Sequence, residues 1–129
     1  MTQKFRLAAI QAAPVLFDKA ASTEKACALI KQAGKDGADF AAFGESWLPG
    51  YPFWIEGGVQ DLTWEASANY LENTVDLDGP EVSALCDAAR EAGTDVVIGV
   101  GERPIQKEPL IVLPSPSAAK VWFSIVTES

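Results

Sequence analysis

The chain has 129 residues, 48% of them hydrophobic and 22% charged, which suits one compact domain with a buried core and excludes a disordered chain. Its formal net charge is −8 and its sequence pI is about 4.4, and this acidic balance argues against nucleic acid and anionic membrane surfaces as partners. The chain has no histidine, so the usual zinc clusters and histidine-activated nucleophiles are excluded within it.

Residues 5–13 form a short, mostly apolar segment closed by Pro14, which indicates a buried strand. An amphipathic helix follows, with a capping residue at Ser22 and an end at Gly34. Its inward face carries apolar residues at i, i+4 and i+7, namely Ala26, Ile30 and Ala33. Residues 39–43 are a second apolar run. A strand, a helix and a strand with brief connections predict parallel pairing with a right-handed crossover.

Residues 44–63 interrupt this alternation. The segment holds several glycines and prolines, which break regular structure, yet it is too apolar for a solvated linker. Its aromatic residues before the next predicted helix are Trp47, Tyr51, Phe53 and Trp54. A long, ordered aromatic loop is more often functional than idle, so we regard this segment as a candidate functional loop.

The alternation resumes with a short helix predicted over residues 64–71. A second helix is predicted to start at Pro80 and stop at Gly93, because proline fits the first helical position and glycine suits a helix end. Its inward face carries three apolar residues, Val82, Leu85 and Ala89. Residues 95–100 are β-branched and apolar, as expected of a central parallel strand. The predicted order is β-α-β-loop-α-α-β, which defines an α/β domain.

Residues 104–129 depart from this theme. They hold four of the chain's eight prolines and few charged residues. No helical pattern separates their two apolar runs, at 110–113 and 121–126, each of which could be a strand. We therefore divide the chain into an α/β region, residues 1–103, and a divergent or frameshifted tail, residues 104–129.

The two cysteines, Cys27 and Cys86, each lie in a segment with a helical pattern and apolar neighbours. We interpret them as small core residues, and two unpaired thiols favour a reducing compartment. No signal-peptide pattern follows the N-terminus, and no stretch approaches the ~20 apolar residues of a membrane-spanning helix. We therefore expect a cytoplasmic protein.

Glu45 follows the apolar run 39–43 after one residue, Gly44, at the predicted carboxyl end of a parallel strand, where functional groups of such sheets collect. Its neighbours are Gly44 on one side and the apolar residues 47–49 on the other. We expect these neighbours to desolvate the carboxylate partly, which would raise its pKa toward the range of a general base. A lone glutamate at a strand end is otherwise a helix-capping or surface residue.

Residues 44–52 (GESWLPGYP) resemble the glutamate motif of the nitrilase, or carbon–nitrogen hydrolase, family, especially the branch that acts on nitriles and cyanide. Residues 4–14 (KFRLAAIQAAP) resemble the opening strand of that family. Residues 79–103 (GPEVSALCDAAREAGTDVVIGVGER) resemble its later helix–strand block. The resemblance therefore covers about residues 4–103 in the right order.

This resemblance implies a partial four-layer α-β-β-α sandwich and a Glu-Lys-Cys triad, with no metal or organic cofactor. In that family a cysteine thiolate attacks the carbon of a nitrile to give a thioimidate. The glutamate is the general base for the thiol and then for water, and the lysine stabilises charge on the tetrahedral species. A carboxylic acid and ammonia leave.

Carried over by position, Glu45 is the general base, and Tyr51 lies in the loop that borders the pocket for a small-molecule nitrile. For Tyr51, Trp47 and Trp54, packing of the loop against the core is an equal alternative. Glu102 resembles a motif position near the end of the sheet, and we interpret it as structural.

The rest of the triad has no match. Beyond Arg103 the family continues to a lysine and a Cys-Trp-Glu-like nucleophile elbow, whereas Lys107 and Lys120 lie in no matching context and neither cysteine has the required neighbours. We therefore expect a truncated chain that hydrolyses no nitrile alone and self-associates through family-type interfaces or an exposed sheet face.

Two other interpretations remain open. The alternative function is a non-catalytic acidic α/β module that pairs with a full-length subunit. A flavodoxin-like binder of small ligands would need a phosphate-cradling loop after the first strand, and residues 11–14 (QAAP) provide no glycine for it.

Overall fold

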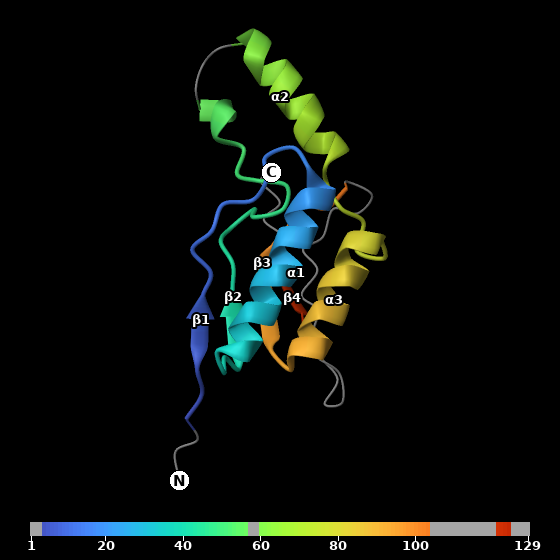
Figure 1. Cartoon of the computed structure of the whole chain (residues 1–129). Helices are drawn as coiled ribbons and strands as arrows, with labels where there is room; N and C mark the ends of the chain where they lie inside the picture. Colours follow the sequence, from blue (N-terminus) through green and yellow to red (C-terminus); the bar gives the residue numbers. More distant parts are fainter. Residues whose placement is uncertain (1–3, 57–59, 104–120, 125–129) are drawn as a thin grey trace.

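The computed structural model describes residues 4–56, 60–103 and 121–124, and this part of the chain is a parallel sheet with helices packed on one face (Figure 1). The strands are β1 (Leu7–Ala9), β2 (Phe40–Ala42), β3 (Asp95–Gly99) and β4 (Val121–Ser124), paired in that order and all parallel. Helices α1 (Lys19–Lys35) and α3 (Pro80–Ala92) lie side by side on one face. The short helix η1 (Phe53–Glu56) and helix α2 (Gln60–Glu72) lie beyond the carboxyl ends of the strands.

The hydrophobic core lies between this face of the sheet and the two helices. Helices α1 and α3 bury the residues predicted to face inward, which are Ala26, Ile30, Ala33, Val82, Leu85 and Ala89. The sheet contributes Ala41, Val96 and Ile98, all fully buried. Because side chains alternate along a strand, the residues between them point to the other face. The predicted amphipathic pattern of both helices is confirmed.

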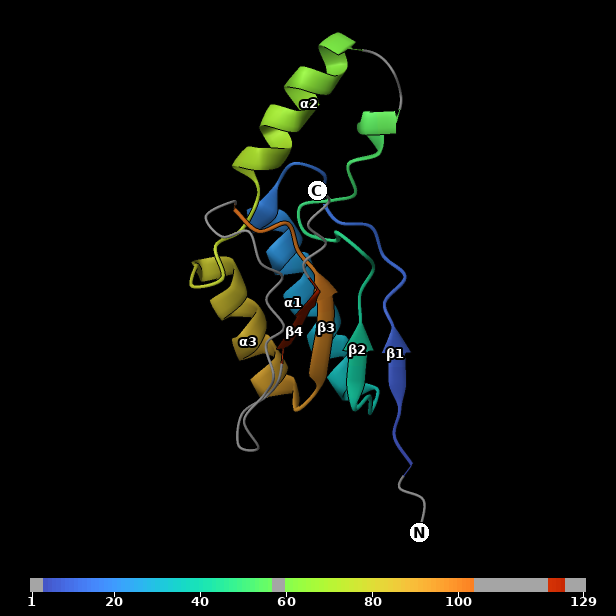
Figure 2. The same cartoon turned by 180° about the vertical axis from the view of Figure 1, so that it is seen from behind.

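The opposite face of the sheet carries no helix in the part of the chain that the structure describes (Figure 2). Apolar side chains lie on it and remain accessible: Phe5 is 69% exposed and Leu7 is 61% exposed. Phe5 packs edge-on against Phe40 of the neighbouring strand, with ring centroids 6.3 Å apart. The described residues thus form two layers, one of helices and one of strands.

The predicted order of elements is confirmed, with changes at the boundaries. Helix α1 starts at Lys19 and not at Ser22, because Asp18 caps it by accepting a hydrogen bond from the Ala21 N–H at 2.9 Å. β1 is shorter than predicted and α2 is longer. β4 lies within the predicted run 121–126, whereas the run 110–113 lies outside the described residues. None of the helices described here is long and apolar enough to cross a membrane.

Candidate active site

Glu45 lies in a short loop that leaves the sheet and returns to it. After β2, the Phe43 N–H still donates to a carbonyl of β3 at 2.8 Å. Residues 44–47 then turn away, and Leu48 returns, its N–H donating to the Gly99 carbonyl at 3.1 Å. Because main-chain bonds attach both ends of the loop to one strand, they define where Glu45 stands relative to the sheet.

The backbone of this loop packs directly against Gly99. A Cβ at this position would lie 2.5 Å from the Ser46 nitrogen and 2.9 Å from the Gly44 carbonyl oxygen. These distances are shorter than a side chain tolerates, so glycine is required for the close approach. Because positions alternate along β3, Gly99 lies on the same face of the sheet as Val97, which is the face away from α1 and α3. The Glu45 loop therefore lies over the uncovered face, at the carboxyl end of the sheet.

Trp47 anchors the other side of the loop in the core. Its side chain is 4% exposed, and its Nε1–H donates to the Ala12 carbonyl at 2.7 Å. The indole meets the ring of Phe43 edge-on, with centroids 5.0 Å apart. Of the two uses that the sequence left open for Trp47, the structure shows packing against the core.

The expected dry surroundings of Glu45 are not observed. Glu45 is exposed, so the prediction of a partly desolvated carboxylate is wrong. The apolar neighbours that were expected to enclose it, Trp47 and Leu48, turn into the core instead. The described residues thus present an accessible carboxylate, which can accept a proton from a thiol or a water molecule that approaches it.

Tyr70 on α2 is a neighbour of this loop that the sequence did not single out. Its phenol forms a hydrogen bond with Ser46, and burial raises the pKa of Tyr70 while this bond opposes the rise. A Cβ at position 101 would lie 2.7 Å from the Tyr70 hydroxyl, so Gly101 makes room for it. Helical periodicity assigns Tyr70 to a helix only, and no local pattern indicates that α2 returns to the Glu45 loop.

Tyr51 and Trp54 come after the Glu45 loop, Trp54 within η1, and they lie in different surroundings. Tyr51 is 51% exposed. Trp54 is 8% exposed, and its Nε1–H donates to the Ser67 hydroxyl of α2 at 3.1 Å. Glu102 takes part in an isolated parallel bridge with Val75, and its neighbour Arg103 donates its N–H to the Val75 carbonyl at 3.0 Å. Glu102 thus belongs to a strand-like extension of the sheet.

The structure does not bring either cysteine to the Glu45 loop. Cys27 lies on α1 and donates to the Ala84 carbonyl of α3 at 3.5 Å, and Cys86 lies on α3. Both thiols are free and partly buried, and burial raises the pKa of each. They belong to the helical layer, on the other side of the sheet from the loop.

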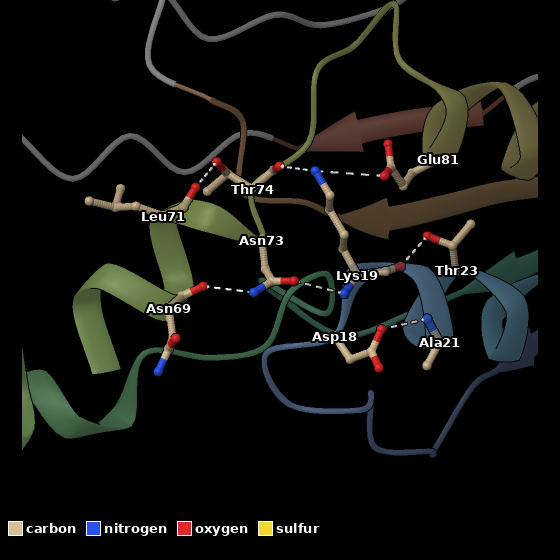
Figure 3. A network of polar contacts seen from close by, with 9 residues as sticks. All are labelled: Asp18, Lys19, Ala21, Thr23, Asn69, Leu71, Asn73, Thr74 and Glu81. Atoms are coloured by element: carbon tan, nitrogen blue, oxygen red, sulfur yellow. Dashed lines mark hydrogen bonds and ion pairs between the residues drawn. The ribbon is translucent and has the colours of Figure 1, made fainter. Parts of the chain in front are cut away.

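Lys19 does not contact Glu45 either. It takes part in a polar network that joins α1 to the connection between α2 and α3 (Figure 3). Its Nζ lies 3.5 Å from the Thr74 carbonyl oxygen and 3.7 Å from Glu81 Oε1. Its backbone N–H donates to Asn73 Oδ1 at 3.1 Å. Lys19 therefore stabilises the packing of three helices and is not a partner of Glu45.

The parallel α/β layer, with the Glu45 loop beyond the carboxyl ends of its strands, is consistent with a fold of the α/β nitrilase type. The family model for carbon–nitrogen hydrolases matches residues 6–121. The chain belongs to the carbon–nitrogen hydrolase family, and its fold is part of the α/β fold of that family.

Curated relatives are nitrilases. The chain is 53% identical over 96 residues to Nitrilase 2 from an unknown prokaryotic organism, covering 74% of this chain and 31% of that protein. It is 38% identical over 104 residues to an aliphatic nitrilase from Rhodococcus rhodochrous, covering 79% and 28%. It is 41% identical over 97 residues to an arylacetonitrilase from Hypocrea virens, covering 75% and 29%. The matched segment thus spans about three tenths of the length of these relatives.

Proposed function

We propose that this chain supplies the general base of a carbon–nitrogen hydrolase that acts on nitriles, and that Glu45 is that base. The observation that carries the proposal is the Glu45 loop itself. It is attached at both ends to β3, rests on Gly99, and leaves the carboxylate accessible beyond the carboxyl end of the sheet. The names of the relatives support a nitrile as substrate. Tyr51, three residues beyond this loop, is proposed to border the substrate.

In this reaction Glu45 takes the proton of a cysteine thiol, and the thiolate attacks the nitrile carbon to form a thioimidate. Glu45 passes this proton to the nitrile nitrogen and can again act as a base. It then takes a proton from a first water, which attacks the thioimidate carbon, and gives it to the nitrogen, so that the C–N bond breaks and ammonia leaves a thioester. A second water, activated in the same way, attacks the thioester, the C–S bond breaks, the thiol regains its proton and the carboxylic acid leaves. Both cysteines of this chain lie in the helical layer, away from Glu45. We therefore propose that a nucleophile and a lysine from outside these 129 residues complete the site, and that the 129 residues alone release no ammonia from nitriles.

A chimera tests the role of Glu45 directly. The segment of Nitrilase 2 that aligns with this chain is replaced by the corresponding residues of this chain, which are 53% identical to it. We expect the chimera to release ammonia from nitriles that Nitrilase 2 hydrolyses. Glu45→Gln should lower kcat by roughly 10²–10⁴-fold or more, because a positioned base contributes about that much.

Glu24→Gln is the matched control, since Glu24 is an exposed glutamate on α1. We expect this variant to keep the activity of the chimera. Full activity of a folded Glu45→Gln chimera would refute the assignment. Ammonia release by the isolated 129 residues that disappears in Glu45→Gln would refute the need for outside groups.

A second candidate function is favoured by the uncovered sheet face. A non-catalytic module that pairs with a full-length subunit, or with a second copy, would need an accessible apolar surface. The exposed side chains of Phe5 and Leu7 provide part of one. The measurement that separates the candidates is the mass of the chain in solution, alone and mixed with a full-length nitrilase. A monomer that pairs with neither would exclude this second function.

A further inference from the structure

A cavity of about 340 Å³ lies beside α2, apart from the loop that carries Glu45. Three segments form it: the connection between β1 and α1, the short helix η1, and α2. Its lining residues are Phe17, Phe53, Trp54, Glu65, Ala66 and Asn69. Most of this lining is aromatic or aliphatic. The volume of the cavity lies at the lower end of the range of about 300–1,000 Å³ in which small-molecule sites fall.

The aromatic walls of this cavity pack on one another, and Trp54 also contacts Tyr70 and Ser67 outside it. The Trp54 ring lies 5.2 Å from Phe17, 5.5 Å from Phe53 and 5.7 Å from Tyr70, centroid to centroid. Its Nε1–H is engaged by the Ser67 hydroxyl at 3.1 Å. An aromatic wall with a fixed orientation loses little freedom when a ligand binds, which favours binding.

Phe17 adds a second observation. Its φ is +58°, a backbone conformation that residues with a side chain rarely adopt. Phe17 is nevertheless one of the residues that line the cavity, and its ring packs on Trp54. Unfavourable backbone conformations of this kind concentrate at functional sites, where the surrounding structure holds them.

The charges near the cavity restrict the ligand. Glu65 is exposed and contributes a carboxylate to the lining, and the chain carries a net charge of −8. A ligand anion would lose hydration against apolar walls and would also meet this carboxylate. A ligand cation would lose the same hydration, and attraction to an exposed carboxylate would offset only part of that loss, whereas for an anion the repulsion adds to it.

We propose that this cavity binds an uncharged compound with a single aromatic ring, and that it rejects the corresponding carboxylate. The ring lies against Trp54, Phe17 and Phe53, and the polar group of the ligand meets the side chains of Asn69 and Glu65. The site is independent of the assignment of Glu45 as a base, because no lining residue belongs to the Glu45 loop at residues 44–48.

Phenylacetamide and phenylacetate are suitable probes, since they are similar in shape and differ in charge. Each is titrated into the ¹⁵N-labelled chain, and the indole N–H signals are followed, with the Trp54 signal identified by its loss in Trp54→Phe. We expect phenylacetamide to shift the Trp54 signal saturably and to leave that of Trp47 in place, because the Trp47 indole is bound to Ala12 in the core. Phenylacetate should bind at least about ten-fold more weakly.

Ala66→Phe tests the cavity by filling it. We expect its affinity for phenylacetamide to fall about ten-fold or more, whereas Ala68→Phe, at an exposed position of the same helix, should bind as the wild type does. If Ala66→Phe loses its dispersed spectrum, Glu65→Gln decides. In Glu65→Gln the ratio of the affinity for phenylacetamide to that for phenylacetate should decrease. Glu72 is also exposed on α2, and Glu72→Gln should leave this ratio unchanged.

Three results would overturn the proposal. The first is the absence of a saturable Trp54 shift with phenylacetamide in the wild type. The second is unchanged affinity in a folded Ala66→Phe. The third is a ratio of affinities for phenylacetamide and phenylacetate that is the same in the wild type and in Glu65→Gln.

Discussion

At the scale of single residues, the place of Glu45 depends on the missing side chain of Gly99. In Gly99→Ala a methyl group would lie 2.5 Å from the Ser46 nitrogen and 3.0 Å from the Glu45 carbonyl carbon, so the backbone of the loop must move. Overpacking of this kind costs about 1–3 kcal/mol. We expect a lower free energy of unfolding in urea and, in the active chimera, a lower kcat.

Gly44→Ala is the control for this variant. Gly44 lies in the same loop, but a Cβ there meets no atom within 4 Å. We expect it to keep nearly all of the stability and activity. Equal losses in the two variants would show that the loop does not rest on Gly99.

The two thiols give a prediction about pH. Burial raises the pKa of Cys27, although Lys31 opposes the rise, and burial raises the pKa of Cys86, although Arg90 opposes it. The thiolate is the reactive form, so alkylation by iodoacetamide near pH 8 should be slower in the folded chain than in urea. Equal rates in the two states would contradict this.

The same shifts affect stability. Because each thiol ionises more readily in the unfolded chain, the unfolded state binds fewer protons once the pH exceeds the ordinary thiol pKa. The two thiols therefore make their full contribution to the free energy of unfolding below that pH. This contribution is lost as the pH rises through their raised pKa values. Unfolding in urea at several alkaline pH values, compared with Cys27→Ala, measures this loss.

At the scale of elements, the sequence predicts both core helices because each has a regular inward face and a defined end. Gly93 has φ +63° and ends α3 where its position suggested. The sequence predicts too late a start for α1, at Ser22, because Asp18 and Ser22 are both capping residues by type. Ser22 instead uses its hydroxyl on the Val15 backbone, accepting at 2.9 Å and donating at 2.8 Å. Local pattern alone does not decide between two such candidates.

Asn73 joins the elements that local pattern does not connect. Its side chain accepts from the Lys19 N–H at 3.1 Å and donates to the Asn69 carbonyl at 2.9 Å, as Figure 3 shows. Asn73→Ala leaves a partly buried N–H and a carbonyl without these partners, which costs about 1–3 kcal/mol. Asn69→Ala is the control in a urea titration, since only its backbone takes part. Equal midpoints for the two variants would argue against the network.

At the scale of the whole molecule, the order of elements along the chain and the place of the loop that carries Glu45 could be predicted, because a parallel α/β chain places such loops at one end of the sheet. The exposure of Glu45 could not, since it depends on Trp47 turning toward Ala12 on another segment. The contact of Tyr70 with Ser46 was equally hidden, because α2 follows a loop whose path no periodicity describes. Residues distant in sequence decide these features.

The sheet face that bears Phe5 and Leu7 gives the last prediction. A sheet buries both faces when helices or a second sheet cover them, and here the described residues cover one. We expect the 129-residue chain to form dimers or larger species in light scattering after size exclusion, and Leu7→Lys to shift it toward monomer. Trp64→Lys is the matched control, because Trp64 is 74% exposed on α2, away from the sheet. A wild-type monomer, or equal dissociation by both variants, would show that the uncovered face is not the surface of association.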